Sequence, residues 1–272
     1  MEKNATVAFA RNGFYNRLKS MLQVDFRRML KTPLFYIVVG SCFVMPILIL
    51  VMTTMMDGTV STNPQTGEQT VIEGFKTVWQ IIGTAGGDMS AAMTMDMTSM
   101  CNINLLYFFV AVFVCIFVSD DFRSGYAKNL FTVRAKKTDY VISKTLVCSV
   151  CGACMFLAFF VGAMLGGGVA QLPFTLEGAS GANVMFCMLA KMFLSVVFVA
   201  IALAVSVAAK QKLWLSILGS FGVGMLLFMT IPLVTPLNAT AVNAVLCLVG
   251  GLVFGIGLGA VSKLVLDKTS LA

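Results

Sequence analysis

The chain has 272 residues, of which 58% are hydrophobic and only 11% are charged, and its mean hydropathy is +0.92. A water-soluble domain carries about 25% charged residues, so this composition excludes a protein whose whole surface faces water. The net charge of +7 suits either a nucleic-acid partner or an oriented membrane protein, and the placement of the basic residues separates the two.

The segment Phe14–Lys31 predicts an amphipathic helix. Its apolar residues recur at steps of three and four, and basic residues occupy much of the remaining surface. Such a helix lies in the plane of the lipid headgroups, and Pro33 suits the turn into a following span. The other interpretation is a segment that serves topology alone.

Six long apolar runs follow, each able to cross a bilayer core of ~30 Å. They lack the alternation of barrel strands and so predict helices. The first starts too late and runs too long for a signal peptide. The fold class predicted for residues 1–272 is all-α integral membrane, a single domain of six transmembrane helices after an amphipathic interfacial helix. The expected spans are about 34–56, 102–118, 145–170, 184–209, 214–235 and 241–262.

Basic residues gather on one side of these spans. Seventeen of the 19 Lys and Arg residues lie in segments 1–33, 119–144, 210–213 and 263–272, whereas the opposite segments hold only Lys76 beside six acidic residues. The positive-inside rule therefore predicts a multi-pass protein of the plasma or inner membrane with both termini cytoplasmic. The basic charge is thus not evidence of a nucleic-acid partner.

The segment 57–101 is the longest one predicted outside the cell. Residues 57–74 are rich in Gly and Thr and contain Asn63 and Pro64, so they are expected to be irregular. Residues 73–82 and 89–100 are each expected to form a short helix at the membrane surface. Five Met residues in the second make it adaptable to apolar ligands, and packing on the membrane is an equal alternative.

The predicted cytoplasmic loop 119–144 carries more apolar residues than a loop needs in order to stay in water. Phe122, Tyr126 and Leu130 are four residues apart, so one face of a helix would be apolar and available to a soluble partner. The residues 140–142 are expected to begin the helix that re-enters the membrane.

This loop resembles the coupling helix in permease subunits of the ABC-2 type exporter family. The resemblance covers the whole chain by layout and this loop by motif. Two residues depart from the family pattern, since Asp121 stands where Glu is usual and Val133 where Pro often precedes the basic residue. The matching residues are Asp121, Gly125, Lys128, Asn129, Leu130 and Arg134, with Lys144 opening the third span.

The resemblance implies an ABC-2 type exporter fold, ATPase subunits that bind ATP and Mg, and a second permease, either a copy of this chain or a related one. It implies a substrate such as an antimicrobial peptide, a lipid-like molecule or a drug, as in permeases of peptide-antibiotic immunity. The chain has no G-x-x-x-x-G-K-[ST] loop, so we expect no bound cofactor and no enzymatic activity of its own. The residues implied in ATPase coupling are Asp121, Phe122, Gly125, Tyr126, Lys128, Asn129, Leu130 and Arg134.

Lys191 is the only charged residue within the six predicted spans. Two interpretations are open: its side chain snorkels to the interface or simply occupies an interface position, or it lines a substrate path. Because no carboxylate lies in a span, coupling to an ion gradient is disfavoured. An ATP-independent carrier or channel, and a membrane scaffold or sensor that binds a cytosolic protein, remain the alternative functions.

Small residues mark two spans. Gly251, Gly255 and Gly259 repeat every four residues in the last span and predict close helix packing, within the chain or between two permeases. The run 166–168 is three glycines, which either loosen the third span or are ordinary membrane-helix glycines. Three Cys residues spaced by three in the same span, 148, 151 and 154, are expected to pack in the apolar core and to bind no iron–sulfur cluster.

Overall fold

The computed structural model describes residues 14–62, 69–83, 101–132, 136–176, 178–210, 212–228 and 230–268. This part of the chain is helical apart from one small hairpin. In chain order its elements are α1 (Phe14–Lys31), α2 (Pro33–Met56), β1 (Val60–Thr62), β2 (Gln69–Val71), η1 (Val78–Ile81), η2 (Ile103–Leu105), α5 (Leu106–Arg123), α6 (Tyr126–Thr132), α7 (Lys137–Val169), α8 (Gly181–Ala209), α9 (Leu213–Phe228), α10 (Ile231–Val234) and α11 (Ala241–Lys268).

Five of the described helices are long and apolar enough to cross a membrane, namely α2, α5 together with η2, α7, α8 and α11. This is the composition of a multi-pass membrane protein. The remaining predicted span, 214–235, is divided into α9 and the short α10. The third predicted span is longer than expected, because α7 already begins at Lys137 and includes the residues 140–142.

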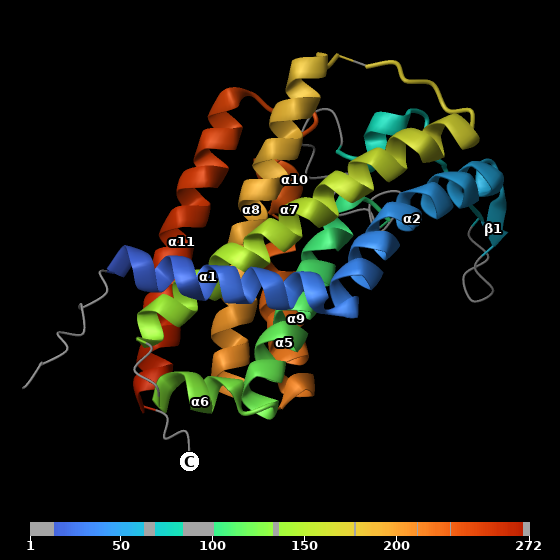
Figure 1. The fold of residues 1–272 in the computed structure, drawn as a ribbon. Helices are drawn as coiled ribbons and strands as arrows, with labels where there is room; N and C mark the ends of the chain where they lie inside the picture. Colours follow the sequence, from blue (N-terminus) through green and yellow to red (C-terminus); the bar gives the residue numbers. More distant parts are fainter. Residues whose placement is uncertain are drawn as a thin grey trace, which may run out of the picture.

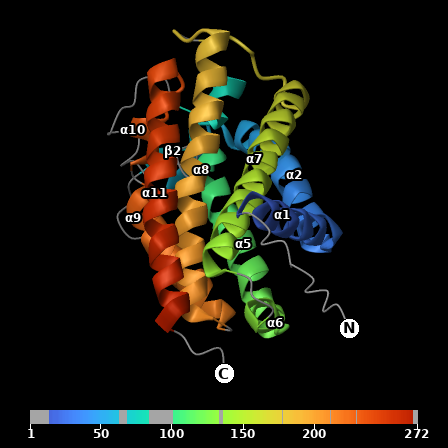
Figure 2. The same ribbon diagram turned by 60° about the vertical axis from the view of Figure 1, so that its left-hand side comes forward.

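The long helices pack in a bundle in which α2 lies along α7 and α8 along α11, while α1 crosses the bundle against α7 (Figure 1). Figure 2 shows α6, the turn between α8 and α9 and the last residues of α11 at one end of the bundle, here called the α6 end. The connection from α7 to α8 lies at the opposite end (Figures 1 and 2).

Helix α1 has the bounds predicted from its amphipathic pattern. Its buried face consists of Met21, Asp25 and Met29, which follow one another at four-residue spacing. Phe14 and Leu30, which belong to the apolar residues recurring at steps of three and four in this helix, are about half exposed. The inner face of α1 therefore carries a carboxylate at its centre.

Helices α2 and α7 approach each other at Gly162 and Gly166, which form a G-x-x-x-G pair. A Cβ atom on Gly162 would meet the carbonyl oxygen of Phe43 at 2.1 Å, and one on Gly166 would meet the Cα of Ile47 at 2.8 Å. A Cβ on Gly167 would meet the side chain of Val78 on η1 at 2.2 Å. Gly166 and Gly167 thus allow tight packing against α2 and η1, a role that neither interpretation of this glycine run included.

The segment after α2 is more regular than predicted. Strands β1 and β2 pair antiparallel, with Val60 opposite Val71, and the carboxylate of Asp57 accepts a hydrogen bond from the backbone N–H of Gly74 at 2.8 Å. Of the two expected surface helices, the first is the 3₁₀ turn η1, whereas residues 89–100 lie outside the described part of the chain.

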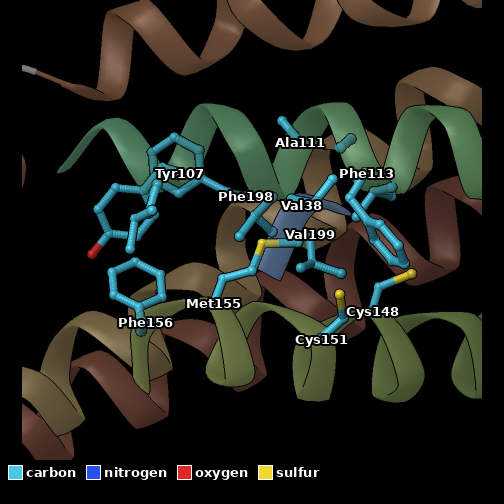
Figure 3. Packing of buried hydrophobic residues seen from close by; sticks show 14 of the residues in the cluster. Val38, Tyr107, Ala111, Phe113, Cys148, Cys151, Met155, Phe156, Phe198 and Val199 are labelled. Atoms are coloured by element: carbon cyan, nitrogen blue, oxygen red, sulfur yellow. The ribbon is translucent and has the colours of Figure 1, made fainter. Parts of the chain in front are cut away.

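The apolar core lies between α5, α7 and α8 (Figure 3). Cys148, Cys151 and Met155 of α7 point into it together with Phe113 of α5 and Val199 of α8, as Figure 3 shows. All eight cysteines are free. Among the described residues no group of three His, Cys, Asp or Glu could hold a metal, and two of the three cysteines of α7 are fully buried packing residues.

Candidate functional site

Four charged side chains meet where α1 crosses the end of α5 and the start of α7. They are Asp25 and Arg28 of α1, Asp121 of α5 and Lys144 of α7, here called the junction cluster. Asp25, Asp121 and Lys144 are fully buried, and Arg28 keeps 27% of its side-chain surface. The cluster is electrically balanced, with two carboxylates and two cations.

Lys144 is the centre of this cluster. Its Nζ lies 2.9 Å from Oδ1 of Asp25 and 2.8 Å from Oδ2 of Asp121, at ion-pair distance but without the alignment of a hydrogen bond. The Nζ also lies 4.1 Å from the centre of the Phe117 ring. Two carboxylates and an aromatic face thus surround a fully buried ammonium, a position that a charge occupies only when it is paired.

Hydroxyl groups complete the coordination of the two carboxylates. Ser143 donates its hydroxyl hydrogen to Oδ2 of Asp25 at 2.6 Å, and Tyr140 donates to Oδ2 of Asp121 at 2.9 Å. Both donors lie on α7 within one turn of Lys144. A single turn of α7 therefore supplies the cation and both hydroxyl partners, so the two aspartates from different helices are fixed relative to it.

Arg28 connects the cluster to its surface. Its Nη1 donates to Oδ1 of Asp121 at 2.6 Å, and its guanidinium lies 4.0 Å from the centre of the Tyr126 ring at the start of α6. Burial alone would lower the pKa of Arg28, but the charge of Asp121 and the hydrogen bond to it prevail, so the pKa lies above its ordinary value. Burial raises the pKa of Tyr126, whose phenol is neutral beside the guanidinium.

Two further ion pairs join the start of α7 to neighbouring helices. Nε of Arg17 on α1 lies 3.1 Å from Oδ2 of Asp139 on α7. Lys137, the first residue of α7, donates to the backbone carbonyl of Leu266 at 2.8 Å and lies 3.2 Å from Oδ1 of Asp267, both on α11. The start of α7 is thereby held to α1 on one side and to α11 on the other.

The corner between α5 and α6 is made by Gly125, whose φ of +73° lies in the left-handed region that glycine adopts without strain. Because of this corner, Phe122 and Tyr126 do not belong to one continuous helix. Phe122 is buried in the core, and Leu130 is partly buried against it. The prediction of a single exposed apolar face on Phe122, Tyr126 and Leu130 is therefore wrong.

The polar side of α6 is the exposed one. Lys128 and Asn129 lie at the surface of the α6 end of the bundle. Of the other residues predicted for this loop, Asp121 lies in the junction cluster and Tyr126 covers Arg28, whereas Arg134 lies outside the described residues. The predicted residues thus divide into a buried set that fixes the corner and an exposed pair that a partner can reach.

Comparison with protein-family models, with curated proteins and with solved structures finds no match for this chain.

Lys191 of α8 lies outside the junction cluster and has polar partners of its own. It is 1% exposed, and its Nζ donates to Oδ1 of Asn104 and to Oγ1 of Thr235, both at 2.9 Å. The Tyr107 hydroxyl donates to its backbone carbonyl at 3.2 Å. The prediction of snorkelling is wrong, because the ammonium is directed into the protein. It joins α8 to η2 and to the residue that follows α10.

The three glycines predicted for close packing in α11 have different environments. A Cβ on Gly251 would meet the carbonyl oxygen of Phe193 on α8 at 2.9 Å, which is a close helix approach. On Gly255 the nearest atom would be Val196 Cγ1 at 4.0 Å, and on Gly259 it would be Val141 Cγ1 at 3.6 Å. Only Gly251 holds two helix backbones together, and the other two face a groove.

Sequence reasoning did not assign Asp25 and Arg28 to the site, and it treated Lys144 only as the start of a span. A signal was present in the sequence. Asp25 lies between Met21 and Met29 on the apolar face of an amphipathic helix, and a carboxylate in such a position requires a buried cation. The sequence did not indicate which cation, because Lys144 is one of six basic residues in the following loop.

Proposed function

We propose that this chain is the permease subunit of an ATP-binding-cassette transporter of the ABC-2 type. The observation that carries the proposal is the junction cluster, which ties the amphipathic helix α1 to the α5–α6 corner and to the start of α7. A force applied to α6 by a motor protein would reach α1, α5 and α7 together, and through α1 it would reach α2.

The layout of the bundle supports the same proposal. We infer six crossings, with α9 and α10 together as the fifth, and an orientation in which the α6 end faces the cytoplasm. The exposed Lys128, Lys212, Lys263 and Lys268 belong to the segments at this end, in agreement with the positive-inside rule. The proposed motor contact is Lys128 and Asn129, with ATP and Mg bound on the partner.

The substrate we propose is amphipathic or apolar, in the class of antimicrobial peptides, lipid-like molecules and drugs. In the described part of the five long apolar helices, the acidic side chains lie towards the α6 end, and Lys191 is the charge farthest from it. An ion-coupled carrier places its ion-binding groups near the middle of the bilayer, whereas the buried Asp121 and Asp139 lie towards the α6 end and are paired with basic side chains. Energy delivered to α6 from outside the bilayer is therefore the source that this chain favours.

The first test is purification of the tagged full-length chain from its native host in mild detergent. The proposal expects a co-purifying protein that carries a phosphate-binding loop and hydrolyses ATP. Absence of such a subunit, together with gradient-driven transport by the chain alone in vesicles, would support the carrier alternative. Recovery of a cytosolic partner without ATPase activity would support the scaffold or sensor.

A matched pair of variants tests the contact itself. Lys128→Glu on α6 is expected to reduce the amount of co-purified ATPase and its substrate-stimulated turnover. Lys212→Glu makes the same charge change at an exposed position of the same end, between α8 and α9, and is expected to leave both unchanged. Equal effects of the two variants would remove α6 as the contact.

A further inference from the structure

An apolar groove runs along the surface of the bundle between α7, α8 and α11. It has a volume of about 500 Å³ and is open along one side. Val141 and Leu146 of α7, Val196 of α8 and Ile256 of α11 supply apolar walls, and Gly251, Gly255 and Gly259 all line it. The groove shares no residue with the junction cluster.

The glycines explain why the groove exists. At Gly251 the backbones of α11 and α8 touch, since an added Cβ would lie 2.9 Å from the carbonyl oxygen of Phe193. At Gly255 an added Cβ would meet nothing closer than 4.0 Å. The helices α8 and α11 therefore meet at Gly251 and separate towards Gly255, and the missing side chains of Gly255 and Gly259 leave room for the groove beside Ile256.

One end of the groove is cationic. Lys263 lines it at the α6 end and is exposed, and none of the ion pairs found in the described part of the chain includes it. Between Lys263 and Gly251 the helix rises ~18 Å at 1.5 Å per residue. This length is close to one leaflet of the hydrocarbon core, ~15 Å. An apolar channel as deep as a leaflet with a cation at its mouth matches an anionic lipid.

We propose that this groove binds one acyl chain of an anionic phospholipid, with Lys263 paired to the headgroup phosphate. A second copy of this chain is a poorer occupant. In a two-fold dimer with its axis along the membrane normal, contact through this face would bring the two Lys263 ammoniums to the same depth, where they repel each other. An anionic headgroup has the opposite charge and fits there.

The experiment measures lipid binding to the purified full-length protein. Phosphatidylglycerol and phosphatidylcholine are titrated separately into the protein in detergent, and bound lipid is counted by native mass spectrometry. Gly255→Leu places a side chain in the groove, and its nearest neighbour is far enough away for the fold to be kept. We expect this variant to bind phosphatidylglycerol about tenfold more weakly, equivalent to ~1.4 kcal/mol.

Gly257→Leu is the matched control, because Gly257 lies on the other side of α11 with open space around its Cβ position and does not line the groove. It is expected to bind as the wild type does. Lys263→Gln removes the charge at the mouth of the groove and leaves its apolar walls unchanged. It is expected to weaken phosphatidylglycerol binding about fivefold, the effect of ~1 kcal/mol per basic residue near anionic lipid, and to leave phosphatidylcholine binding unchanged.

Three results would overturn the proposal. The first is a Gly255→Leu variant that binds phosphatidylglycerol as tightly as the wild type does. The second is a Lys263→Gln variant that keeps the full preference for phosphatidylglycerol over phosphatidylcholine. The third is loss of a dimer in Gly255→Leu with lipid binding intact, which would assign the groove to a second copy. None of these measurements depends on the ATPase partner, so a negative result would contradict the lipid site without contradicting the proposed function.

Discussion

Asp25 and Asp121 bind the same ammonium from two different helices. Asp25 belongs to α1, Asp121 lies near the end of α5, and their carboxylates lie 2.9 and 2.8 Å from Nζ of Lys144. The negative charge of each aspartate is balanced by a cation from another helix. The position of α1 on the bundle is therefore defined by charge balance at a single atom of α7 as well as by apolar contact.

Replacement of Lys144 by Met is expected to destabilise the protein strongly. The change keeps most of the side-chain volume but leaves two buried carboxylates facing each other, and loss of one partner from a buried ion pair costs about 3–5 kcal/mol. Thermal unfolding in detergent measures the effect. Lys128→Met, at an exposed site of α6, is the control and is expected to change the unfolding temperature little.

Addition of Asp25→Asn to Lys144→Met is expected to recover part of that loss. The double variant restores charge balance within the junction cluster, since Asp121 then remains as its one buried carboxylate beside Arg28. Contacting residues of one network show coupling energies of about 0.5–3 kcal/mol in double-mutant cycles. Simple additivity of the two single changes would contradict the shared-ammonium geometry.

Arg28→Lys is expected to weaken the attachment of α6 despite the conserved charge. The planar guanidinium of Arg28 donates to Asp121 and at the same time lies 4.0 Å from the centre of the Tyr126 ring. A lysine ammonium has no planar group and cannot make both contacts. We expect a lower unfolding temperature and faster proteolysis at the α5–α6 corner. Arg27→Lys, the exposed neighbour on α1, is the comparison, and equal behaviour of the two variants would contradict a special role of Arg28.

Gly162→Ala is expected to destabilise the packing of α2 on α7 by about 1–3 kcal/mol, the usual cost of overpacking. The added Cβ would meet the carbonyl oxygen of Phe43 at 2.1 Å, so the two backbones must separate. Gly168→Ala changes an exposed glycine of the same helix with nothing within 4 Å and is expected to be neutral or stabilising. Thermal unfolding of both variants in parallel makes the comparison.

Lys191 is expected to resist chemical modification in the folded protein. Its ammonium is buried between Asn104 and Thr235, whereas Lys76 has 72% of its side chain exposed. An amine-reactive ester added to the protein in lipid, followed by peptide mass spectrometry, should label Lys76 first and Lys191 only after unfolding. Early labelling of Lys191 would support a snorkelling side chain.

The long elements of this protein follow from the sequence. Apolar runs of membrane length and the amphipathic pattern of Phe14–Lys31 predict the bounds of α1 and α2 closely, because bilayer thickness and helical periodicity are properties of short stretches of chain. The same local reasoning found the loop that contains Asp121 and Lys128. It could not find the break at Gly125, because a residue that permits a left-handed turn is not obliged to make one.

The contacts between helices could not be predicted from local sequence patterns. A row of glycines is equally compatible with close packing and with an open groove, and Gly251 and Gly255 show both outcomes in one helix. Lys191 gave no local indication of whether its chain would turn inward, since the acceptor Asn104 is distant in sequence. Pairing of Asp25 with Lys144 depends on how α1 crosses α7, and no spacing within either helix encodes that crossing.

Thr32 is the single residue between α1 and α2 outside regular helix, and its hydroxyl and its N–H are both bonded to the carbonyl of Arg28. A connection of one hydrogen-bonded residue allows α1 and α2 little independent movement. If α1 tilts while the chain stays helical on both sides, the two backbone angles of Thr32 must absorb the rotation or α2 must turn with it. Movements of α1 and α2 are therefore mechanically coupled through Thr32. An insertion of a few glycines between the two helices would remove this coupling and leave every side chain of both helices unchanged.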